Sequence, residues 1–368
     1  MTLQRTSRLV GLLAAGTLAL AACGGSDSDT TGSASPGASP AGQSLSGTLS
    51  GAGASSQAAA MEAWRAGFQT ANPDVTVNYD PVGSGGGREQ FTAGGTDFAG
   101  TDRAMKPEEL TAAAKRCGDG GKVIDLPVYV SPIAVAFNLE GVQELKLKPD
   151  TIAKIFNQKI TNWNDPAIKT DNPDANLPDL RITPVNRQDD SGTTENFTDY
   201  LAKTAKQSWP YEADGVWPVA GGEAANGTSG VVQALKGGNG TIGYADASQV
   251  ADLGKVSVGV GSEFVPYSPE AAAAVVSESP RDDAREQGDI VIDLQRDTTR
   301  GGEYPIVLVS YELACTKYKD AKTGELVKGF YTYLASKEGQ QAAAEAAGSA
   351  PLSDKLAADV QKSIDSIS

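Results

Sequence analysis

The chain has 368 residues with 42 Gly and no His, and its 46 acidic and 31 basic side chains give a formal net charge of −15. Without His there is no Ser-His-Asp or Cys-His nucleophile, no imidazole general base and no His-containing zinc site, which excludes most hydrolase mechanisms. The acidic excess repels polyanions, so we expect no nucleic-acid partner. Binding of a small anion is still compatible with this charge, provided that a local site holds it.

The N-terminus has the pattern of an export signal. Arg5 and Arg8 precede a mostly apolar run over 9–22, and this run is shorter than the ~20 residues that a membrane span needs. We therefore expect a signal peptide over 1–22. The alternative reading is an uncleaved anchor helix.

A single cysteine follows the apolar run directly. The segment Leu20-Ala21-Ala22-Cys23 resembles the lipobox of bacterial lipoproteins, in which the Cys becomes a lipid-modified N-terminus. Residues 24–44 then contain no large apolar side chain, which is typical of a flexible tether. We expect lipid attachment at Cys23, a tether over 23–45, and an exported protein held at the outer face of the cell membrane.

After the tether, strand-like and helix-like segments alternate, which indicates an α/β fold. In chain order we expect a strand at 45–49, a helix at 57–70, a strand at 75–79, a helix from Arg88, a strand at 97–102, a helix at 107–116 and strand-rich sequence over 123–138. The later segments predict a helix at 149–157, a strand at 181–186, a helix after Ser191, a buried strand at 304–314, and helices from Ala321, Lys337 and Pro351.

The length and the order of these segments favour two domains, because one core rarely grows beyond ~300 residues. The middle of the chain differs in its sequence pattern from the parts before and after it. We therefore predict a two-lobed protein in which residues 46–129 and 304–368 form lobe I and residues 130–303 form lobe II, so that the chain crosses between the lobes twice.

Three segments share one local pattern, in which Gly with Ser or Thr stands before a helix. They are Gly51–Ser56, Gly83–Gly87 and Asp189–Thr194. The first backbone N–H groups of a helix have no internal partner and lie at the positive end of the dipole, so such a segment can hold an anion. Each one alone is more typical of an ordinary N-cap and turn. None matches a nucleotide-binding loop or a nucleophile elbow.

Two charged residues lie close to these segments. Arg187 precedes Ser191 by four residues and could bind the same anion bidentately, although an ion pair with Asp189 or Asp190 is the simpler reading. Asp102 ends an expected strand, where open α/β sheets bind ligands, although it could equally be a turn cap.

Cysteine usage points to an oxidising compartment. With Cys23 lipidated, Cys117 and Cys315 remain, and a leftover pair in an exported protein is more often bridged than free. We expect this disulfide; the alternative is two buried thiols.

The motifs together resemble the PstS family, the phosphate-binding proteins of the high-affinity phosphate ABC transporter. The resemblance is carried, in order, by Gly51–Ser56, Val77–Gly87, Thr96–Asp102, Ile160–Pro166, Arg187–Thr193, Gly240–Tyr244 and Tyr304–Ile306. It extends from residue 46 to the end of the chain.

The resemblance implies a class II periplasmic-binding-protein fold with mixed sheets flanked by helices and a ligand cleft between hinged lobes. Its phosphate-binding residues correspond here to Ser55, Ser56, Ser84, Asp102, Arg187, Ser191, Gly192 and Thr193, with Asp189 supporting Arg187. It also implies ABC permease subunits as partners, a monomer, and no enzymatic activity, metal or other cofactor.

Two positions depart from the family pattern. Ser55-Ser56 stands where Thr and a large apolar residue are frequent, and Gly85 stands where a second Ser is common. Three other readings remain open: a receptor for another oxyanion such as sulfate, a secreted phosphatase of related fold, and a surface adhesin or signalling lipoprotein.

Overall fold

The computed structural model describes residues 45–368, which belong to one compact unit. The predicted signal peptide 1–22, Cys23 and nearly all of the tether therefore lie outside the described residues. None of the helices described between residues 45 and 368 is long and apolar enough to span a membrane.

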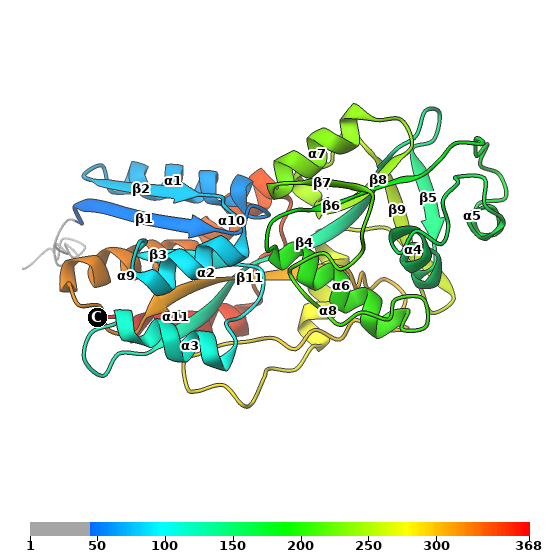
Figure 1. The fold of residues 1–368 in the computed structure, drawn as a ribbon. Helices are drawn as coiled ribbons and strands as arrows, with labels where there is room; N and C mark the ends of the chain where they lie inside the picture. Colours follow the sequence, from blue (N-terminus) through cyan, green and yellow to red (C-terminus); the bar gives the residue numbers. More distant parts are fainter. Residues whose placement is uncertain (1–44) are drawn as a thin grey trace, which may run out of the picture. The chain divides into compact units, whose positions relative to one another are not determined.

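A long, buried strand organises the fold (Figure 1). This strand is β4 (Val123–Asn138), which pairs with β11 (Val307–Cys315) through its first part, up to Pro132, and with β8 (Thr241–Asp246) from Ile133 onward. All but one of its residues are buried. We call the strands around its first part, with their helices, the first lobe, and those around its second part the second lobe.

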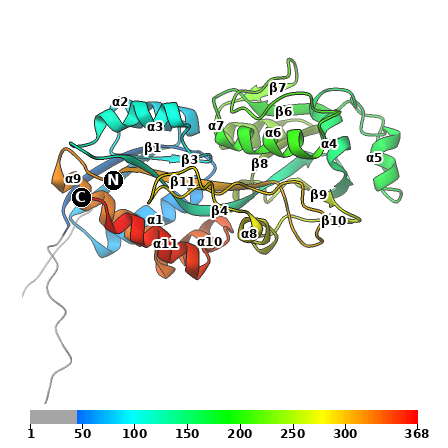
Figure 2. The same ribbon diagram turned by 90° about the horizontal axis from the view of Figure 1, so that it is seen from below.

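The first lobe has the strand order β2-β1-β3-β11-β4. Its further strands are β1 (Gly47–Gly53), β2 (Val75–Asp80) and β3 (Phe98–Thr101). Strand β1 is parallel to β2 and β3, whereas β11 is antiparallel to β3 and β4. Its helices are α1 (Ala58–Ala71), α2 (Ser84–Ala93), α3 (Pro107–Ala113), η1 (Ala114–Arg116), α9 (Ala321–Ala335), α10 (Lys337–Ala347) and α11 (Asp354–Asp365). Figure 2 shows α2 and α3 on one face of this sheet and α1, α10 and α11 on the other.

The second lobe continues the order as β4-β8-β6-β7, while β9 pairs with β4, β5 and β10. Its further strands are β5 (Glu144–Leu147), β6 (Thr183–Arg187), β7 (Glu223–Ala225), β9 (Gly254–Val260) and β10 (Glu263–Val265). Its helices are α4 (Pro149–Phe156), α5 (Pro166–Asp171), α6 (Gly192–Thr204), α7 (Gly227–Gly237), η2 (Ala247–Gln249) and α8 (Pro269–Glu278). The mixed sheet flanked by helices confirms the predicted fold class.

A segment after α8 contacts the first lobe, although it falls within the range 130–303. Arg285 Nη2 donates to the carbonyl of Met105 at 2.8 Å, and the Ile290 amide donates to the carbonyl of Asp125 at 3.0 Å. The Asp125 amide in turn donates to Asp289 Oδ1 at 2.9 Å. The predicted lobe boundaries stay a prediction, but this segment ties the second half of the chain to β4.

Cys117 and Cys315 are joined by a disulfide, the pairing that the cysteine count predicts. The two residues are 198 positions apart in sequence, and their Cα atoms are 5.5 Å apart. Because Cys117 follows η1 and Cys315 ends β11, the bridge connects the chain before and after the whole second lobe.

Some expected elements begin or end elsewhere. The first strand extends to Gly53, beyond the expected 45–49. The helix expected from Arg88 begins at Ser84 and so includes Gly85 to Gly87 in its first turns. The last helix begins at Asp354 because Ser353 caps it, accepting from the Leu356 amide.

Candidate anion-binding site

Asp102 lies at the centre of a buried polar cluster, directly after β3, with 3% of its surface exposed. Its Oδ1 accepts hydrogen bonds from Ser56 Oγ at 2.7 Å and from Ser310 Oγ at 2.5 Å. Its Oδ2 accepts one from Thr193 Oγ1 at 2.8 Å, and its backbone amide donates to Ser84 Oγ at 3.1 Å. The residues predicted from separate segments of the sequence thus meet around one carboxylate.

Ser310 belongs to this cluster and was not predicted. It lies on β11, whose residues are all buried. A hydroxyl and, two residues later, a carboxyl in such a strand need polar partners, because burying an unpaired polar group is costly. The alternation of Ser310 and Glu312 within an apolar run was the signal that could have identified this strand as part of the site.

The segment Asp189–Thr194 brings the second lobe into contact with Asp102. Ser191 is the N-cap of α6, since its Oγ accepts from the Thr194 amide at 3.2 Å. A Cβ on Gly192 would lie only 2.7 Å from Asp102 Cβ and from Ser84 Oγ, so only glycine permits this approach. Asn196 Nδ2 donates to the carbonyl of Asp102 at 2.7 Å and to that of Gly192 at 2.9 Å, which ties the two lobes together.

Arg187 is buried at the end of β6, with 2% of its side chain exposed. Its Nε donates to Asp189 Oδ1 at 2.8 Å, and its Nη2 bonds Asp189 Oδ2. Burial alone would raise the pKa of Asp189, but the hydrogen bond and charge of Arg187, with the Gly227 amide, lower it below its usual value. Arg187 Nη1 has no hydrogen-bond partner among residues 45–368, so one donor of the guanidinium stays available.

Ser55 faces α7 rather than Asp102. Its Oγ lies 3.1 Å from Thr228 Oγ1 and accepts from the Thr228 amide at 3.0 Å. The Gly227 amide donates to Asp189 Oδ1 at 3.0 Å, so the start of α7 contacts both Ser55 and Asp189. A cavity of about 320 Å³ is lined by Ser55, Asp189 and Gly227 together with Pro81 and Gln249, among others.

The chemistry of the site is that of an anion receptor. It combines hydroxyls, helix N-terminal amides, one arginine and one buried carboxylate. Among the described residues no group of three or more His, Cys, Asp or Glu side chains could hold a metal ion.

Comparison with known proteins identifies the family. The profile of the PBP superfamily domain matches residues 38–338. The phosphate-binding protein PstS3 of Mycobacterium bovis (strain BCG / Pasteur 1173P2) is 38% identical over 338 residues, covering 90% of each chain. The phosphate-binding protein PstS2 of the same organism is 35% identical over a 381-residue alignment, covering 100% of each chain. The chain belongs to the PstS family.

Solved structures share the fold of this PstS-family chain. A high-affinity periplasmic phosphate-binding protein (PfluDING) bound with phosphate aligns with a TM-score of 0.68 at 23% identity, over 85% of this chain and 92% of that one. A phosphate-binding protein from Stenotrophomonas maltophilia aligns with a TM-score of 0.67 at 20% identity, over 86% and 94%. These alignments confirm the predicted periplasmic-binding-protein fold.

The geometry accounts for both departures from the PstS pattern. At Gly85 a Cβ would lie 2.5 Å from the carboxyl carbon of Asp190, and the Gly85 amide donates to the Asp190 carbonyl at 3.1 Å. Asp190 therefore occupies the space that the side chain of a second serine at position 85 would need. Ser56, in place of a large apolar residue, supplies a hydroxyl to Asp102.

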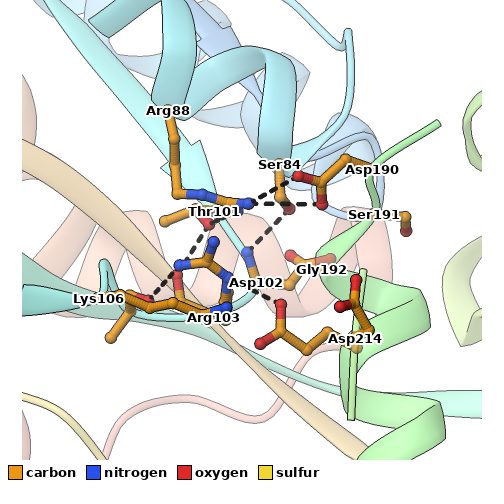
Figure 3. Close-up of polar contacts among 12 residues, drawn as sticks. Ser84, Arg88, Thr101, Asp102, Arg103, Lys106, Asp190, Ser191, Gly192 and Asp214 are labelled. Carbon is orange, nitrogen blue, oxygen red and sulfur yellow. Dashed lines mark hydrogen bonds and ion pairs between the residues drawn. The ribbon is translucent and has the colours of Figure 1, made fainter. Parts of the chain in front are cut away.

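Two ion pairs at the lobe boundary were not predicted from the sequence, and Figure 3 shows the one between Arg88 and Asp190. Arg88 on α2 bonds Thr101 Oγ1 at 3.0 Å and reaches across to Asp190 at 3.2 Å. Arg103 pairs with Glu195 on α6 at 2.8 Å. Pairs between distant segments leave no local pattern, so neither could be predicted.

Proposed function

We propose that this PstS-family protein is the extracytoplasmic substrate-binding component of an ABC importer, which binds inorganic phosphate between its lobes and delivers it to permease subunits. The relatives named above are phosphate-binding proteins by name. We further propose a monomer that acts as a receptor and not as an enzyme. The absence of His from the sequence supports this, because a phosphatase of related fold would need another base.

The environment of Asp102 is the observation that carries the proposal. An ionised carboxylate offers about four lone-pair sites. Three are taken by the hydroxyls of Ser56, Ser310 and Thr193, which leaves one acceptor for a protonated phosphate oxygen. Fully ionised sulfate has no proton to offer it, so the same site favours phosphate over sulfate.

The remaining roles follow from the donors around this carboxylate. We propose that the anion is held by the hydroxyls of Ser55, Ser84 and Ser191, by the backbone amides of Ser56, Gly192 and Thr193, and by the free donor of Arg187, because the hydroxyls of Ser56 and Thr193 already donate to Asp102. Asp189 holds two of the guanidinium nitrogens and so orients the third. We propose that residues 46–129 with 304–368 form one lobe, that residues 130–303 form the other, and that the two lobes close on the ligand.

Calorimetric titration of the mature protein with phosphate and with sulfate tests this function. We expect phosphate to bind and sulfate to bind far more weakly. Arg187→Ala should weaken phosphate binding by about 100-fold, because a hydrogen bond from a charged donor is lost and Asp189 is left unpaired.

Arg181→Ala, on an exposed residue of the same lobe, is the matched control and should leave the affinity unchanged. Binding of neither anion would support the adhesin or signalling reading instead. Hydrolysis of a chromogenic phosphate monoester would establish a phosphatase.

We also propose that Cys23 carries the lipid that holds the mature protein at the outer face of the cell membrane. Cys23→Ala should release the protein from the membrane fraction or leave the signal peptide uncleaved, because the modified residue is lost. Fractionation and mass spectrometry measure both results. Unchanged mass and membrane association in the variant would disprove lipidation at this position.

A further inference from the structure

A second buried carboxyl group, Glu312, lies close to the proposed phosphate site. It is fully buried on β11, two residues after Ser310, which donates to Asp102. Alternate side chains of a strand point to the same face, so Glu312 and Ser310 share one face of β11. Glu312 also pairs with Gly100 of β3, two residues before Asp102.

The space beside Glu312 exists because Gly100 has no side chain. A Cβ on Gly100 would lie 1.8 Å from Gln57 Nε2 and 2.6 Å from Tyr79 Oη. Paired residues of neighbouring strands place their side chains on the same face. Gln57 and Tyr79 therefore occupy the face on which Glu312 lies, and Gln57 Nε2 donates to Tyr79 Oη at 3.1 Å.

Glu312 has no cationic partner, and neither of its oxygens accepts a hydrogen bond, in the part of the chain that the structure describes. Both of its carboxyl oxygens, and Oε1 of Gln57, are buried without a hydrogen-bond partner in the described part of the chain. A protonated Glu312 could donate to Gln57 Oε1, which would pair that amide oxygen and one of the two carboxyl oxygens. An ionised carboxylate in the same place would have only the weak influence of the Gln57 amide to offset its burial, and burying a charge with so little compensation is far more costly.

The charged and titratable neighbours are all acidic. Asp102 after β3 acts on Glu312, and Glu312 acts on Tyr79 of β2 and Tyr331 of α9. Gln57, at the start of α1, is neutral, and no Arg or Lys of residues 45–368 contributes to the surroundings of Glu312. Burial and, to a smaller extent, the charge of Asp102 raise the pKa of Glu312 to about 8, against the opposing influence of the Gln57 side-chain amide.

We propose that Glu312 is a neutral acid beneath the phosphate site and that its ionisation opposes phosphate binding. While Glu312 is protonated, it adds no charge to the buried surroundings of Asp102. Loss of its proton to solvent adds a negative charge close to Asp102, and so close to the bound anion. The inference rests on the proposed function, and it makes phosphate capture dependent on pH through this residue.

Glu312→Gln tests the proposal because it keeps the shape of the side chain and removes its charge. Phosphate affinity is measured by calorimetry for both proteins at about pH 6.5 and about pH 9. We expect equal affinities at the lower pH and about tenfold tighter binding by the Gln variant at the higher pH. The ionisation of phosphate itself is common to both proteins and cancels from the comparison.

Two further variants make the comparison specific. Glu338→Gln, on an exposed residue at the start of α10, should bind like the wild type at both pH values. Glu312→Met removes the charge without requiring the hydrogen bonds of an amide, and it replaces the Gln variant should that variant not fold. Equal affinities of wild type and charge-free variant at both pH values would overturn the proposal.

A measurement without phosphate separates this inference from the proposed function. The folded-state pKa of Glu312 lies above its ordinary value of 4.5, so its contribution to stability is complete below that value and is lost as pH rises toward about 8. The urea midpoint of the wild type should fall relative to that of Glu312→Gln over this range. Parallel midpoints would show that Glu312 is not a neutral acid, whether or not phosphate binds.

Discussion

Asp102→Asn is expected to narrow the ratio of phosphate to sulfate affinity by about 10³-fold or more. In the wild type, the carboxylate accepts a hydrogen bond from protonated phosphate but presents only lone pairs and negative charge to sulfate. The amide of the variant can donate, so sulfate binding should rise while phosphate binding falls. Calorimetry with both anions gives the ratio directly.

The fold should tolerate this substitution. The three hydroxyls on Asp102 come from Ser56, Ser310 and Thr193, and a hydroxyl can accept as well as donate. Asp171→Asn is the matched control, because it makes the same chemical change on a buried carboxylate that pairs with Lys148 away from the site. The control should keep the ratio within about twofold. An unchanged ratio in Asp102→Asn would mean that this carboxylate does not contact the ligand.

Removing the disulfide is expected to lower the free energy of unfolding by about 3–5 kcal/mol. The bridge spans 198 residues, so its loss frees a large loop in the unfolded chain, and the entropic gain of that chain grows with loop length. The double variant Cys117→Ala/Cys315→Ala avoids free thiols. Urea unfolding monitored by fluorescence measures the difference.

Phosphate affinity should change little in the double variant, because the bridge joins η1 to the end of β11 and not the residues around Asp102. Wild-type protein unfolded with a reductant is the control and should match the double variant. Equal unfolding free energies with and without the bridge would contradict the prediction and would mean that the bridge does not restrict the unfolded chain enough to change its stability.

Strong local patterns made much of the fold predictable. The apolar spacing in 57–70 and the alternation in 75–79 correspond closely to α1 and β2, and the long apolar run over 123–138 is β4. The glycine run before Arg88 was misleading, because glycine is a poor helix former. Here α2 includes these glycines, since a Cβ on Gly87 would lie 2.5 Å from Gly53 Cα and one on Gly85 would meet Asp190.

Only those site residues that belong to a recognisable sequence segment could be predicted. Ser56, Ser84, Asp102 and Thr193 come from such segments, and they meet in the fold. Ser310 and the pairing of Arg88 with Asp190 depend on contacts between distant parts of the chain. The orientation of Ser55 toward Thr228 likewise depends on where α7 begins, which the sequence leaves open.

The first of the two crossings between the lobes is the strand β4, and the return crossing at 304–306 is hydrogen-bonded to it, which has a mechanical consequence. At the point where β4 passes from β11 to β8, the Ile133 amide donates to the Ile306 carbonyl at 2.7 Å, and Tyr304 Oη donates to the Ile133 carbonyl at 2.8 Å. Sliding one lobe past the other would break these bonds, whereas bending about the line of the crossing keeps them. The stiffness of β4 and its hydrogen bonds to the return crossing therefore limit how far the lobes can swing.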